Sequence, residues 1–173
     1  MGSWTGMLWQ RGWGNDDIEQ NAMSDDARST PVGFYHYAHA YAASALALTS
    51  ADVASTHPDA PIRFLYSHAV ELYLKSYLLL NGVSLKLLGS HDFGHNVARL
   101  LDRAEQLGLA AQDVHRAYAQ FLNEAISDRY IQTGSRRVLS NENLFEFCVY
   151  LHDQIGPLIY ADSNLTRSPM SLK

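Results

Sequence analysis

Apolar residues recur at intervals of three and four positions along most of this chain, which is the spacing of helices that bury one face. The predicted helices span residues 32–52, 61–80, 92–107, 111–130 and 140–160. No segment shows the alternation of apolar and polar residues that a half-buried strand requires. Short loops between long helices favour antiparallel neighbours. The pattern therefore predicts an all-α, up-and-down antiparallel bundle of about five helices.

The same spacing predicts which face of each helix points inward. The expected core positions are Phe34, Ala38, Tyr41, Ala45 and Leu48 on the first helix, Val97, Leu100, Leu101 and Ala104 on the third, Val114, Tyr118, Phe121 and Ala125 on the fourth, and Leu144, Cys148, Leu151 and Ile155 on the fifth. The second helix carries two adjoining apolar stripes, as a central helix does. Glu71 and Lys75 fall outside these stripes and form a favourable pair one turn apart.

Capping and helix-breaking residues indicate where several helices begin and end. Ser90 or Asp92 is predicted to cap the third helix, and Ser140 the fifth. Gly108 suits the position that follows the third helix, because glycine tolerates the left-handed conformation there. Pro157 is predicted to kink or end the fifth helix, since proline lacks the backbone N–H of a helix interior.

The bundle accounts for residues 31–162, which form one domain between two terminal segments. The tail 163–173 is polar and expected to fray. Residues 1–30 form an extension that contains Trp4, Trp9 and Trp13. This extension is a loosely ordered tail, the product of a start codon placed too early, or a segment whose tryptophans dock on the bundle or on a partner chain.

Composition narrows the class of protein. Hydrophobic residues make up 47% of the chain, enough for a core without disulfides, and the single cysteine excludes an intrachain disulfide. The formal net charge of −5 argues against general nucleic-acid binding but allows a local basic patch. There is no secretory signal and no apolar run long enough to span a bilayer. A soluble, cytoplasmic protein without membrane contact is expected.

Three motifs, in their order along the chain, resemble those of the HEPN family. The second helix contains Ser67-His68-Ala69-Val70-Glu71-Leu72-Tyr73-Leu74-Lys75, a turn is followed by His91-Asp92-Phe93-Gly94-His95-Asn96-Val97-Ala98-Arg99-Leu100-Leu101, and Arg129-Tyr130 closes the fourth helix. The resemblance covers about residues 31–160. It implies a helical bundle, a homodimer, and membership of a defence or toxin–antitoxin system with a cognate protein partner. HEPN members include ribonucleases and noncatalytic modules, so the fold alone does not choose between them.

Ribonuclease members carry an arginine followed four to six residues later by a histidine, near the start of a late helix. Only Arg63 and His68 have this spacing here, and they lie in the second helix. Five residues turn a helix by about 140°, which points the two side chains apart. The catalytic signature is therefore absent or displaced. His91 and His95 are further weak candidates for a catalytic histidine. A metal-independent ribonuclease with a displaced pair is an alternative function.

Arginines cluster around the loop that follows the fourth helix. Arg129, Tyr130, Arg136 and Arg137, with Lys75, are expected to bind the phosphate of a nucleotide or of RNA. The competing interpretation is a solvated loop. The leading hypothesis is a noncatalytic HEPN-like module that binds such a ligand or a protein partner.

Two pairs of histidines have spacings that can present imidazoles to one metal ion. His36 and His39 are three residues apart, and His91 and His95 are four apart. A metal-binding bundle enzyme that uses all four is a second alternative. The absence of a suitably placed carboxylate argues against it, so neither a metal nor another cofactor is expected.

Overall fold

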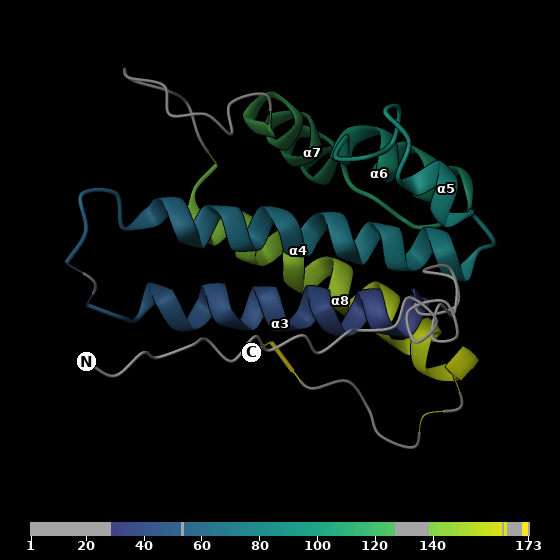
Figure 1. Ribbon diagram of the computed structural model, residues 1–173, viewed down its shortest axis with the longest axis horizontal. Helices are drawn as coiled ribbons and strands as arrows, with labels where there is room; N and C mark the ends of the chain where they lie inside the picture. The colour runs from purple at the N-terminus through teal and green to yellow at the C-terminus, as the bar shows by residue number, and fades with distance from the viewer. Residues whose placement is uncertain (1–28, 53, 127–138, 164, 166–170, 173) are drawn as a thin grey trace, which may run out of the picture.

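The computed structural model describes residues 29–52, 54–126, 139–163, 165 and 171–172. These residues form helices and no strand: α3 (Pro31–Thr49), α4 (Asp59–Leu80), α5 (Leu85–Leu88), α6 (Val97–Gln106), α7 (Asp113–Ile126) and α8 (Asn141–Ser163) (Figure 1). The helices pack into one bundle, so the all-α prediction is confirmed. None of the described helices combines the length and the apolar character needed to cross a membrane.

Helix α4 lies at the centre of the bundle, as its double apolar stripe predicts. It packs against α3, α6 and α8 (Figure 1). Helices α5, α6 and α7 lie on the side of α4 opposite α3. Because neighbours surround it, α4 buries residues around most of its circumference: Ile62, Tyr66, Ala69, Val70, Glu71, Tyr73, Leu74, Ser76, Tyr77 and Leu78.

The predicted core faces are right for some helices and rotated for others. The expected positions on α6 and α8 are buried, and Cys148 is fully buried, which raises the pKa of its thiol. Helix α3 instead buries a stripe shifted by one residue at its start: Tyr35, Ala38, Ala42 and Ala45. On α7, Val114 is exposed and His115 is buried in its place.

The third predicted helix begins five residues later than expected. Residues before Val97 form turns, and the N-cap is Asn96, whose side chain accepts a hydrogen bond from the Arg99 amide, rather than Ser90 or Asp92. The short helix α5 was not predicted, because four residues are too few to establish a period. Gly108 follows α6 with a φ of 100°, as predicted.

The C-terminal part departs from two expectations. Helix α8 continues past Pro157 to Ser163, because Ile155 and Ile159 on either side are buried and hold the helix in place. Ser140 caps this helix as predicted, accepting from the Asn143 amide at 3.2 Å. The polar tail was expected to fray, yet Leu172 is buried as part of the core.

Candidate functional site in the pocket before α6

A buried ion pair on α4 lies next to the site, where Glu71 contacts His95. The Lys75 ammonium lies 2.7 Å from Oε1 of Glu71, and the two side chains are 12% and 5% exposed. The helical spacing of four residues brings them together, as the sequence predicts. What the sequence did not predict is the burial: α6 packs over this face of α4, so the pair lies inside the molecule.

His95 joins this pair from the turn before α6. Its Nδ1 lies 3.1 Å from both carboxylate oxygens of Glu71. A carboxylate can only accept, so the imidazole donates from Nδ1. The neutral ring then carries its lone pair on Nε2. Because the His95 side chain is 52% exposed, one end of the ring is fixed by Glu71 while the rest of it faces outward.

Backbone hydrogen bonds shape the turn that carries His95. The Gly94 amide donates to the Ser90 carbonyl at 2.7 Å, and the Asn96 amide donates to the Phe93 carbonyl at 2.8 Å. A Cβ at Gly94 would lie only 3.0 Å from the Ser90 carbonyl oxygen. To accept a side chain there, the Ser90 carbonyl would have to move by a few tenths of an ångström, so glycine suits this position.

Side chains from two helices hold the turn in place. Asn96 caps α6, and its Oδ1 also accepts from Nδ2 of Asn123 on α7. Arg99 reaches back to Asp92, with 2.8 Å between Nη1 and Oδ1. The position of His95 therefore depends on the packing of α4, α6 and α7.

The turn before α6 and Asn123 of α7 line an open pocket of about 440 Å³, which we call the α6 pocket. Its lining residues are Gly89, Ser90, His91, Gly94, His95, Asn96 and Asn123. Within the described part of the chain, the buried Ser90 Oγ has no hydrogen-bond partner. Such a buried group needs a water or a ligand to satisfy it. The pocket thus gathers imidazole, hydroxyl and amide groups beside a carboxylate that Lys75 neutralises.

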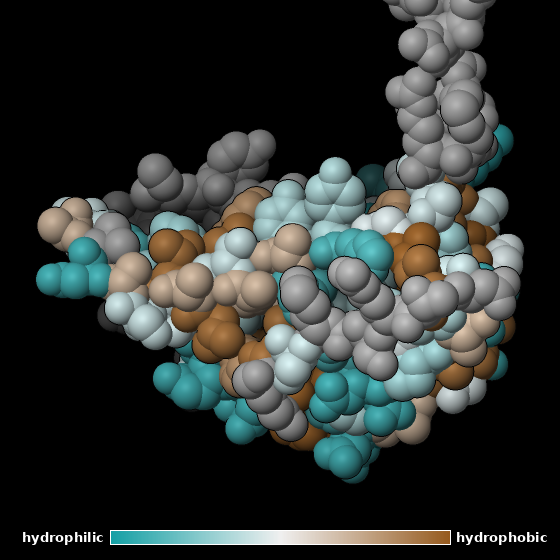
Figure 2. Space-filling model, turned by 90° about the horizontal axis from the view of Figure 1, so that it is seen from below, coloured by the Kyte–Doolittle hydropathy of each residue, from teal (hydrophilic) through white to brown (hydrophobic). Residues whose placement is uncertain are grey.

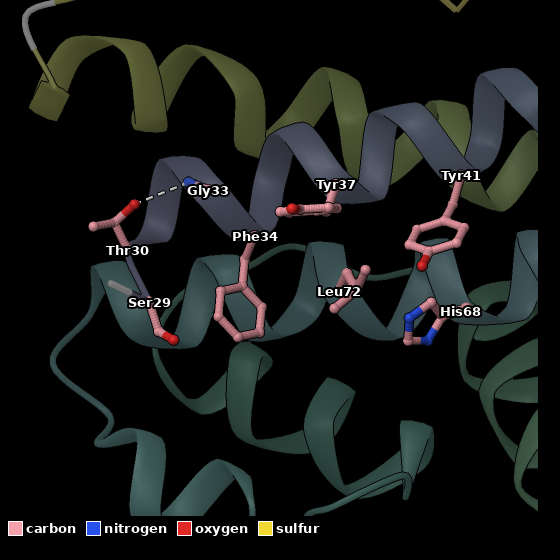
Figure 3. Close-up of a pocket in the computed structure, with 8 residues that line it drawn as sticks. All are labelled: Ser29, Thr30, Gly33, Phe34, Tyr37, Tyr41, His68 and Leu72. Carbon is pink, nitrogen blue, oxygen red and sulfur yellow. Dashed lines mark hydrogen bonds between the residues drawn. The ribbon is translucent and has the colours of Figure 1, made fainter. Parts of the chain in front are cut away.

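The structure gives Arg63 and His68 different neighbours. Arg63 pairs with Asp59 at 3.6 Å. The His68 ring lies against Tyr41 and Phe64, with ring centroids 4.6 and 6.2 Å away. His68 also lines a separate groove between α3 and α4, and in Figure 3 the Tyr41 hydroxyl points toward it.

The four histidines of the metal-binding alternative do not form one site. His36 bonds to the Tyr160 hydroxyl at 3.0 Å, and the His39 ring lies 5.4 Å from that of His152. His91 and His95 line the α6 pocket. Among the residues that the structure describes, no group of three or more His, Cys, Asp or Glu side chains could hold a metal.

A buried network that sequence reasoning missed lies between α3, α4 and α8. The hydroxyls of Tyr35 and Tyr73 lie 2.8 and 3.2 Å from Nδ1 of His152. Burial raises the pKa of both hydroxyls well above the ordinary value, so they stay protonated. With His152 only 5% exposed, the network satisfies polar atoms inside the core.

Most of the predicted basic site lies outside the residues that the structure describes. Arg129, Tyr130, Arg136 and Arg137 fall outside the described residues, as do Trp4, Trp9 and Trp13. Lys75, the remaining member, is mostly buried and pairs with Glu71, the residue that His95 contacts.

Sequence reasoning placed Glu71 outside the apolar stripes of its helix, in a pair with Lys75, and did not single out Ser90, Asn96 or Asn123 as site residues. One feature of the sequence did indicate that Glu71 is buried, because it stands between apolar residues on a helix that is apolar on most sides.

Comparison of the chain with protein-family models, with curated proteins and with solved structures gives no match.

Proposed function

We propose that this chain is a noncatalytic, HEPN-like module that binds the phosphate of a nucleotide or of RNA in the α6 pocket. The observation that carries this proposal is the attachment of His95 to Glu71 through Nδ1, because it leaves Nε2 of a residue that lines the pocket available for another partner. A protonated His95 can donate from Nδ1 to Glu71 and from Nε2 to a phosphate oxygen at the same time. Hydrogen bonds of this charge-assisted kind are among the strongest that proteins form.

The charge balance around His95 supports an anionic ligand. Glu71 alone would repel a phosphate, but the Lys75 ammonium 2.7 Å away offsets its charge. His91 adds a further donor to the pocket wall. Because the overall charge of −5 gives no general attraction for anions, binding depends on local groups such as these.

The predicted basic loop can contribute to the same ligand. Asn123 lines the pocket, and Arg129 follows it by six residues, so the two Cα atoms are at most about 21 Å apart. Arg129, Arg136 and Arg137 therefore come from a segment whose start is tethered near the pocket. Their guanidinium groups would hold a second phosphate or the backbone of a longer RNA.

A binding experiment with two probes tests the proposal. ADP is titrated by calorimetry, and a fluorescein-labelled single-stranded oligoribonucleotide by anisotropy. We expect His95→Gln to weaken binding by tenfold or more, while His57→Gln on an exposed loop, where it bonds to Thr56, leaves it unchanged. Equal affinities for both variants, or no binding of either probe to the wild type, would refute the proposal.

One observation favours an enzyme as the second candidate: His91 and His95 line the same pocket. In a metal-independent ribonuclease, Nε2 of His95 would take the proton of the RNA 2′-hydroxyl, O2′ would attack phosphorus, and the P–O5′ bond would break. A protonated His91 would return a proton to O5′. Incubating the protein with a panel of RNAs in the presence of EDTA distinguishes the ribonuclease from the noncatalytic module. Cleavage lost in His95→Ala supports this enzyme, cleavage lost in His68→Ala supports the displaced motif, and no cleavage supports the module.

A further inference from the structure

The surface of α3 lacks the charged residues that an exposed helix face normally carries. None of its 19 residues is Asp, Glu, Lys or Arg, yet only four of them are buried. The exposed residues are His36, Tyr37, Ala40, Ser44, Leu46, Ala47 and Thr49. By contrast, the shorter α6 carries Arg99, Asp102, Arg103 and Glu105. A surface helix ordinarily presents polar and charged side chains to water, so the uncharged face of α3 indicates an occupant.

An aromatic groove runs along this face beside α4. Its volume is about 270 Å³, and its lining residues are Ser29, Thr30, Gly33, Phe34, Tyr37, Tyr41, His68 and Leu72 (Figure 3). Tyr37 is 67% exposed, and Phe64, which stacks on His68, is 60% exposed. Figure 2 views the molecule from below, where brown and tan side chains lie among white and teal ones on the visible surface. The groove has the size and character to take an indole ring.

The N-terminal extension has the composition to fill this groove. Residues 1–15 contain Trp4, Trp9 and Trp13, together with Met7 and Leu8, and their only charged side chain is that of Arg11. Residues 16–28 are strongly acidic by contrast. The extension is thus an apolar, aromatic segment attached through a polar connection, and it matches the uncharged face of α3.

The point of attachment favours the chain's own segment over a second copy. The extension joins the bundle at Ser29, which is itself a wall of the groove. The 13 residues from 16 to 28 span about 20 Å as a coil and about 45 Å when extended. Helix α3 is about 28 Å long, so Trp13 can reach any part of it. Tethering gives the segment an effective concentration on the order of millimolar, above that of a second copy in dilute solution.

From these observations we infer that residues 1–15 bind back onto their own bundle, with tryptophan in the groove between α3 and α4 and the uncharged face of α3 covered. The docked segment shields Tyr37 and Phe34 from water. A second copy of the chain, which the HEPN resemblance implies, is the competing occupant of this face.

Tryptophan fluorescence tests this inference directly, because all three tryptophans of the full-length chain lie in the extension. We expect emission at shorter wavelength than for the urea-unfolded chain, and several-fold weaker quenching by acrylamide. Tyr37→Asp should shift the emission to longer wavelength and restore quenching. The matched control is Val114→Asp, which places the same charge at an exposed position on α7 and should change neither signal. Circular dichroism verifies that both variants remain folded.

Two results would overturn the inference. Wild-type emission and quenching equal to those of the unfolded chain would show that the tryptophans remain in water. Protection that disappears on dilution, together with a dimer–monomer transition in light scattering, would show that a second copy covers α3. Protection that is independent of concentration and sensitive to Tyr37→Asp supports docking within one chain.

Discussion

At the scale of single residues, Glu71 determines the chemistry of the α6 pocket. It is the only buried carboxylate among the described residues, at 3% exposure, and it contacts both Lys75 and His95. Removing one member of a buried charge pair leaves the other without compensation, which costs more than losing the pair as a whole. Glu71 therefore links the stability of the bundle to the orientation of His95.

This link predicts a non-additive result for substitutions at Glu71 and Lys75. Glu71→Leu alone should lower the free energy of unfolding by about 3 kcal/mol, because the Lys75 ammonium remains mostly buried without a partner. The double variant Glu71→Leu/Lys75→Met should recover most of that loss but bind ADP poorly, since His95 has lost its anchor. Urea denaturation and calorimetry measure the two effects. A double variant as unstable as the single one, or one that binds normally, would contradict this view.

His115 predicts a pH dependence of stability. Burial lowers its pKa below the ordinary value of 6.5, because the ring stacks on Phe147 inside the bundle. Between that lowered pKa and 6.5, the unfolded chain binds the proton and the folded chain does not. The free energy of unfolding should therefore fall as the pH drops below about 6.5.

The test compares this pH dependence between two histidine variants. His115→Asn keeps an acceptor for the Gln112 amide but removes the titrating ring, so its loss of stability between pH 7 and pH 5 should be smaller than that of the wild type. His57→Asn on an exposed loop is the control and should follow the wild-type curve. Identical slopes for all three proteins would show that another group causes the dependence.

The sequence predicts some residues of the candidate site and misses others for a physical reason. His91, His95 and Lys75 were candidates because their side-chain chemistry is visible in the sequence. Their convergence with Glu71 was not predictable, since it depends on how α6 packs on α4. Asn123 comes from a third helix, 27 residues after Asn96, and no local pattern indicates their contact.

At the scale of elements, the residues on the outward side of each helix decide how well its inward face can be predicted. Helix α6 has charged residues on one side and apolar ones on the other, so its core face was correct. Helix α3 has no charged residue, and its apolar positions fit more than one rotation. On α7, the spacing favoured Val114, but the ring of His115 packs against Phe147 instead. Periodicity establishes that a helix exists more firmly than its rotation.

The N-cap of α6 should affect both stability and binding. Asn96→Ala removes the acceptor for the Arg99 amide and for Asn123, so we expect a loss of about 1–2 kcal/mol in unfolding free energy. Because His95 is the preceding residue, ADP affinity should fall as well. Asn96→Asp preserves the acceptor and should retain most of the stability.

The matched control for this cap is Ser140→Ala, which removes the N-cap of α8 away from the pocket. It should lower stability by a similar amount while ADP affinity remains that of the wild type. Chemical denaturation and calorimetry on the three variants provide the comparison. Equal loss of affinity in Asn96→Ala and Ser140→Ala would mean that binding follows global stability rather than the geometry of the turn.

At the scale of the whole molecule, the chain carries two surfaces with different properties, the α6 pocket and the aromatic groove. The α6 pocket is lined by residues of the segment between α5 and α6 and by Asn123 of α7, and the aromatic groove is lined by residues of α3 and α4 with Ser29 and Thr30. One surface is polar with imidazole groups, and the other is uncharged and aromatic. Since the two share no lining residue, changes at one should leave the other largely unaffected.

This separation predicts how ligand binding stabilises the complete chain. A ligand that binds only the folded state adds about 2.7 kcal/mol when its concentration is a hundred times its Kd. For a chain of 173 residues, this corresponds to an increase in Tm of about 5–10 °C. We expect ADP to produce such an increase in the wild type and in Tyr37→Asp, but not in His95→Gln. The increase should shrink as salt rises, because the attraction is electrostatic. Differential scanning calorimetry across a salt series measures it, and loss of the effect in Tyr37→Asp would show that the two surfaces are coupled through α4.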